Sequence, residues 1–77
     1  MHVQDQLLEF LREATGSRIG PDDDYFEMGL VNSLFALELV TFVEQRFGFT
    51  VEVEDLRLEH FRTVDRLTGF VAAKTAA

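Results

Sequence analysis

Apolar side chains recur every three or four residues in three stretches of this chain, which is the spacing of an amphipathic helix. The three helices that this pattern predicts span residues 3–14, 33–47 and 64–74. Gly16 and Gly48 directly follow the first two stretches and are typical stop signals for a helix. Most of the chain is therefore expected to be helical.

The segment between the second and third helices is harder to assign. Residues 49–53 alternate apolar and polar side chains, as a strand does, but the chain offers no second strand to pair with them. We expect an extended connection that tucks Val51 or Val53 inward, followed by a short helical turn over Asp55–Phe61. The predicted fold class is all-α, a small four-helix bundle with three main helices and one short helix.

Residues 16–32 form a connection that is long for a chain of this size, and long loops in small domains are often functional. Its apolar residues are expected to pin it onto the core: Tyr25, Phe26, Met28, Leu30 and Val31. Asn32 or Ser33 can cap the second helix, and Thr63 can cap the last one. The core that this arrangement predicts consists of Phe26, Leu39, Val43, Phe47, Phe61, Val64, Leu67 and Phe70.

The composition limits what such a chain can be. Its 77 residues, 47% of them apolar, suit one domain over residues 1–77 and leave little room for a large cleft of its own. There is no cysteine, which excludes a disulfide framework, a thiolate nucleophile and a cysteine-ligated zinc. No apolar run is long enough to span a bilayer and the N-terminus lacks the pattern of a signal peptide. We expect a cytoplasmic, free-standing monomer that does not bind membranes.

The net charge of −7 is unevenly distributed. Residues 20–61 hold ten acidic and two basic residues. Such a field repels the phosphates of nucleic acid and attracts basic protein surfaces. If a divalent cation binds, the expected site is Asp22–Asp24 with Glu27, or else Glu52, Glu54 and Asp55, although a solvated acidic loop is the simpler interpretation.

Ser33 is the residue best placed for chemistry. It stands at the start of the strongest helix, just after a glycine turn and an apolar clamp, so its hydroxyl is expected to be accessible to the active site of another protein. The free amides and the positive end of the helix dipole would favour a phosphate attached there. From the residues alone, a plain N-cap serine explains the same position.

The run from Asp24 to Phe47 resembles the acyl carrier protein family. The residues that match its pattern are Phe26, Met28, Gly29, Leu30, Ser33 and Leu34, and the likeness extends over residues 7–71. The resemblance implies that Ser33 carries 4'-phosphopantetheine, which would make the chain a phosphoprotein. It also implies that the protein is not an enzyme, and that its partners are a phosphopantetheinyl transferase and enzymes that load and modify acyl groups.

Some positions depart from the common pattern of the family. Asn32 stands where most relatives have aspartate, Phe35 replaces an acidic residue, and the Gly-Gly pair of peptidyl carriers is absent before Ser33. The string from Val31 to Glu44 is most similar to discrete carriers for methoxymalonyl-type, glycerate-derived polyketide extender units. That similarity implies a role in polyketide and antibiotic biosynthesis, with a polyketide synthase acyltransferase as a partner.

A helical projection of residues 33–47 separates a core stripe from an outer face. Leu34, Leu37, Glu38, Thr41 and Glu44 fall outside the stripe. Exposed leucines ringed by acids and lying beside a modifiable serine are expected to form the docking surface for basic partner enzymes.

Other functions fit less well. A nucleophilic Ser33 would need a base, and the only histidines are His2, near the N-terminus, and His60 in the predicted short helix. Asp22–Asp24 begins like a calcium loop but lacks the glycine and glutamate that such a loop needs, so no metal site is assigned. A peptidyl or aminoacyl carrier and a helical adaptor without a prosthetic group remain the alternatives.

Overall fold

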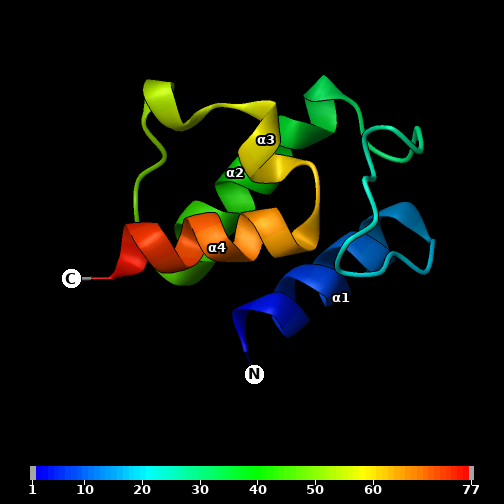
Figure 1. Cartoon of the computed structure of the whole chain (residues 1–77), viewed down its shortest axis with the longest axis horizontal. Coiled ribbons are helices and arrows are strands. Elements are labelled where there is room, and N and C mark those ends of the chain that lie inside the picture. Colours follow the sequence, from blue (N-terminus) through cyan, green and yellow to red (C-terminus); the bar gives the residue numbers. More distant parts are fainter. Residues whose placement is uncertain (1, 77) are drawn as a thin grey trace.

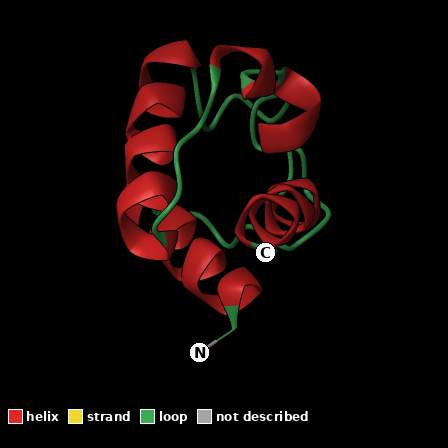
Figure 2. Cartoon of the chain, turned by 90° about the vertical axis from the view of Figure 1, so that its left-hand side faces the viewer, coloured by secondary structure: helices red, strands yellow, loops and turns green. Residues whose placement is uncertain are grey.

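Four α-helices make up most of the regular structure in the computed structural model, which describes residues 2–76 (Figure 1). They are α1 (Val3–Thr15), α2 (Ser33–Phe47), α3 (Leu58–Phe61) and α4 (Val64–Thr75), with a 3₁₀ turn, η1 (Val53–Asp55), before α3. Within the described residues there is no strand (Figure 2). The predicted all-α bundle is confirmed, with α1 and α4 each ending one residue later than expected.

The helix α4 is the element that holds the bundle together. It packs against α1 and α3 and also contacts α2 (Figure 1). Its buried side chains follow helical spacing, which places them on the inner side: Val64, Leu67, Phe70 and Val71. Because α1, α2 and α3 all contact α4, the position of α3 relative to α2 depends on how α4 packs against both.

The predicted capping residues are confirmed by the conformation and hydrogen bonds at the helix ends. The Asn32 side chain accepts from Phe35 N at 2.9 Å, and so acts as the N-cap of α2 in preference to Ser33. Thr63 caps α4 in the same way. Gly16 and Gly48 end α1 and α2 with positive φ angles of 68° and 72°, a conformation that glycine adopts without steric cost.

The buried core is contributed by all four helices and by the loop before α2. It consists of Leu7, Leu11, Ile19, Tyr25, Val31, Leu39, Val43, Phe61, Val64, Leu67, Phe70 and Val71. Six of the eight predicted core residues are among them. Phe26 and Phe47 are only partly buried, because Phe26 lines a surface groove and Phe47 packs edge-on against Phe42 at the rim.

The predicted short helical turn is confirmed as α3, but it spans Leu58–Phe61 and begins three residues later than expected. The segment divides into η1 and α3, with Leu56 and Arg57 between them outside any helix. The Asp55 carboxylate accepts from Glu52 N at 3.0 Å and pairs with Lys74 at 2.7 Å, which ties the end of η1 to α4 and interrupts the helix. Before η1 the chain is extended as expected, with Val51 partly buried and Val53 82% exposed.

None of the helices formed by residues 2–76 has the length and apolar character that crossing a bilayer requires.

Candidate functional site

Residues 24–31 fold into a compact turn that leads into α2. The Tyr25 carbonyl accepts hydrogen bonds from Leu30 N and Val31 N, and Asp24 O accepts from Met28 N. The Tyr25 and Val31 side chains are buried, so they hold the turn against the core as predicted. Met28 does not, because 53% of it is exposed.

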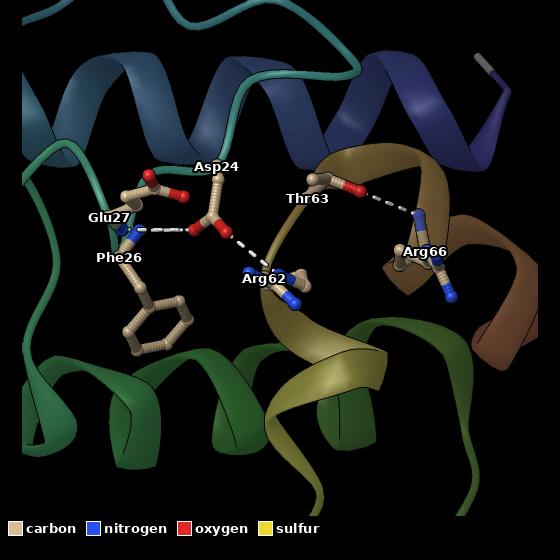
Figure 3. Close-up of polar contacts among 6 residues, drawn as sticks. All are labelled: Asp24, Phe26, Glu27, Arg62, Thr63 and Arg66. Carbon is tan, nitrogen blue, oxygen red and sulfur yellow. Dashed lines mark hydrogen bonds and ion pairs between the residues drawn. The ribbon is translucent and has the colours of Figure 1, made fainter.

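The Asp24 carboxylate organises this turn and attaches it to the other half of the chain (Figure 3). One oxygen, Oδ1, accepts from Phe26 N at 3.1 Å and from Glu27 N at 3.0 Å. The other, Oδ2, accepts from Arg62 Nε at 2.7 Å, at the junction of α3 and α4. The hydrogen bond from Glu27 N and then the Arg62 guanidinium lower the pKa of Asp24 below its ordinary value.

A second hydrogen bond reinforces the attachment. Asp65 N, in the first turn of α4, donates to Pro21 O at 2.8 Å. The loop before α2 is therefore joined to the α3–α4 junction at two points. Neither Arg62 nor Pro21 is predictable in this role from the sequence, because no local pattern signals a contact between residues about forty positions apart.

Tyr25 brings a buried polar atom into the core beside this turn. Its side chain is fully buried, and its hydroxyl has no hydrogen-bond partner among residues 2–76. Burial, followed by the nearby charge of Asp24, raises the pKa of Tyr25 far above its ordinary value. The phenol therefore stays neutral.

Ser33 is the first residue of α2 and is exposed. Because Asn32 serves as the cap, the Ser33 hydroxyl makes no hydrogen bond within the described part of the chain. It opens onto a groove of about 290 Å³ between α2 and the η1–α3 segment. The residues that line this α2–α3 groove are Phe26, Ser33, Ala36, Leu37, Val40, Leu56, Arg57, Leu58 and Phe61.

Four of the five residues predicted to dock partners are exposed on α2: Leu34, Leu37, Glu38 and Thr41. Leu34 and Leu37 are 74% and 63% exposed, as the helical projection predicts. Leu37, Glu38 and Thr41 line a second groove, of about 410 Å³, together with Phe10 and Phe42. Leu37 borders both grooves.

Glu44 differs from the other predicted docking residues. Its side chain is partly buried, and its Oε2 accepts from Val51 N at 2.8 Å. It therefore holds the extended connection after α2 in place, a structural role that the helical projection did not indicate.

Neither of the acidic runs considered as a cation site forms one in the part of the chain that the structure describes. Within residues 2–76 no three acidic or histidine side chains come together in a way that would hold a metal ion. The carboxylates of these runs bind the protein itself: Asp23 accepts from Gly20 N at 2.8 Å, Asp24 pairs with Arg62, and Asp55 pairs with Lys74.

Comparisons with known proteins agree with this geometry. Residues 3–71 match the model of the phosphopantetheine attachment site family. Similar curated proteins include the D-alanyl carrier proteins of Leuconostoc mesenteroides and Streptococcus suis, which are 29% and 28% identical to the chain over 73 residues. The alignments cover 92% of this chain in both cases, and 94% and 92% of those proteins. A D-alanyl carrier protein of Bacillus velezensis is 29% identical over 90% of the chain and 92% of its own length.

Members of this family hold acyl groups on a 4'-phosphopantetheine arm and do not catalyse a reaction themselves. Their partners are phosphopantetheinyl transferases and acyl-handling enzymes. The chain described here, an all-helical fold with an exposed serine at the start of α2, belongs to the phosphopantetheine attachment site family of carrier proteins.

Proposed function

We propose that Ser33 is the attachment point for 4'-phosphopantetheine and that residues 1–77 form a single acyl carrier domain. The observation that carries this proposal is the exposed Ser33 hydroxyl, which makes no hydrogen bond to the protein and opens onto the α2–α3 groove. The only other serine, Ser17, lies in the loop after α1 and begins no helix.

The surroundings of Ser33 suit the group. Because Asn32 caps α2, the Ser33 hydroxyl is left available for a phosphodiester bond. The positive end of the helix dipole favours the negative charge that such a bond introduces. When bound, the arm supplies a thiol that holds the acyl group as a thioester. Since the chain has no cysteine, no thiol of its own competes for the cargo.

We propose that the cargo is a polyketide extender unit of the methoxymalonyl type and that the carrier works in the cytoplasm with acyl-loading enzymes and a polyketide synthase acyltransferase. The similarity of residues 31–44 to carriers of that class supports this assignment. A second candidate is an aminoacyl cargo, because the similar curated proteins named above are D-alanyl carriers.

Partner enzymes would approach the exposed side of α2. Leu34 lies next to Ser33, while Glu38 and Thr41 lie farther along the helix and are also exposed. Their exposure and the acidic charge of this half of the chain support docking by basic enzyme surfaces.

The attachment site is tested by intact-mass measurement after incubation with CoA and a broad-specificity phosphopantetheinyl transferase. We expect one adduct per chain, lost in Ser33→Ala and retained in the matched control Ser17→Ala. An adduct that persists in Ser33→Ala would contradict the assignment. The mass of the acyl group on protein isolated from the producing cells then separates an extender unit from an amino acid.

A further inference from the structure

The α2–α3 groove has one charged residue in an otherwise apolar lining. Seven of its lining residues are apolar: Phe26, Ala36, Leu37, Val40, Leu56, Leu58 and Phe61. Ser33 and Arg57 are the other two. Arg57 therefore lines the same groove as the serine to which the cargo would be attached.

The backbone of Arg57 is held firmly. Its N–H donates to Asp55 O at 2.8 Å, and its carbonyl accepts from His60 N at 3.0 Å. Asp55 is in turn tied to α4 through Lys74. The backbone of Arg57, from which its side chain extends, is thus fixed beside the groove.

The guanidinium, by contrast, has only a weak partner. Within the described residues its one ion pair is with Glu59, at 3.6 Å, and the two side chains are 65% and 56% exposed. A long, exposed pair of this kind contributes little free energy. The pairs of Arg62 with Asp24 and of Lys74 with Asp55 are both 2.7 Å long, so Arg57 is the more available cation.

We propose that Arg57 makes the α2–α3 groove selective for acyl cargo that ends in a carboxylate. The proposal rests on attachment at Ser33. The apolar walls would contact the carbon chain, and the planar guanidinium can bind a carboxylate through two parallel hydrogen bonds. The ammonium group of an aminoacyl cargo would be repelled by the same charge, so Arg57 favours the first of the two cargo classes considered above.

The experiment uses protein loaded at Ser33 with pantetheine arms in which an amide replaces the thioester, so that the cargo does not hydrolyse. Three cargoes are compared: succinyl labelled with ¹³C at its free carboxylate, the neutral carboxamide analogue, and alanyl. The ¹³C shift of the carboxylate is titrated, and the Arg57 Nε–H and neighbouring amide signals are recorded by NMR.

We expect the pKa of the succinyl carboxylate on the carrier to lie below that on free pantetheine by roughly half a pH unit, the size available to an exposed ion pair. Arg57→Gln should abolish this difference and Arg57→Lys should retain part of it. Arg18→Gln, which removes an exposed charge from the loop after α1, should leave it unchanged.

Three results would overturn the proposal. The first is a succinyl carboxylate pKa that is the same in wild type and Arg57→Gln. The others are a shift of the Arg57 Nε–H signal with the carboxamide cargo, or with the alanyl cargo, that equals its shift with the succinyl cargo. The second of these would show that Arg57 contacts the phosphate of the arm. Failure to load Ser33 at all is a separate outcome, and it would contradict the proposed attachment site itself.

Discussion

The Asp24 carboxylate and the Arg62 guanidinium lie 2.7 Å apart, although 38 positions separate them in the sequence (Figure 3). Asp24 also accepts the amides that form the turn before α2. Arg62 immediately follows α3, one wall of the α2–α3 groove. This single contact therefore couples the loop that presents Ser33 to the segment that would receive the cargo.

Asp24→Asn should lower the melting temperature at neutral pH and reduce the dependence of stability on pH. Because the pKa of Asp24 is lowered in the folded state, its carboxylate stabilises the fold above the ordinary value of about 4, and that contribution is lost as the pH falls through the folded-state pKa. Thermal melts between pH 7 and pH 3 measure both effects.

The matched control is Asp22→Asn, at an exposed carboxylate in the same loop that makes no hydrogen bond in the described part of the chain. Equal melting curves for the two variants at every pH would show that the pair with Arg62 does not stabilise the loop.

Glu44 and Glu38 should respond differently to substitution by lysine. Glu44→Lys removes the acceptor of Val51 N and is expected to cost about 1–2 kcal/mol of unfolding free energy. Glu38→Lys changes an exposed residue and should alter stability by less than about 0.5 kcal/mol, while it slows modification by the transferase. Urea unfolding and transferase kinetics on both variants distinguish the structural role from docking.

Truncation of two leucines on α2 separates the exposed face from the core. Leu39 is fully buried, so Leu39→Ala should cost about 2–5 kcal/mol. Leu34→Ala should change the free energy of unfolding by less than about 0.5 kcal/mol, because Leu34 is 74% exposed, yet reduce the rate of phosphopantetheine transfer. If Leu34→Ala unfolds the protein, then Leu34 belongs to the core and the docking face has been assigned to the wrong side of α2.

Tyr25→Phe should leave the fold intact and raise the free energy of unfolding by up to about 1 kcal/mol. The substitution removes a buried hydroxyl that has no hydrogen-bond partner among residues 2–76 while it keeps the ring that fills the core. Differential scanning calorimetry measures the change. A decrease of similar size in the free energy of unfolding would mean that the Tyr25 hydroxyl is hydrogen-bonded in solution, for example to a buried water molecule.

The main helices, their capping residues and the candidate serine could all be predicted from the sequence. Helical periodicity, the N-caps Asn32 and Thr63, and the glycine stops at residues 16 and 48 are local features, because each acts over a single turn of backbone. The exposure of Leu34 and Leu37 follows from the same local geometry.

How these helices pack against one another could not be predicted from the sequence and follows from the tertiary structure. It split the segment 55–61, because the contact of Asp55 with Lys74 depends on where α4 lies. The same packing places Glu44 within hydrogen-bond distance of Val51 N and pairs Asp24 with Arg62. It also places Arg57 in the lining of the groove that Ser33 borders. Each of these contacts joins residues separated by several turns or by whole helices, so it depends on the packing of the core as a whole, which no local sequence pattern encodes.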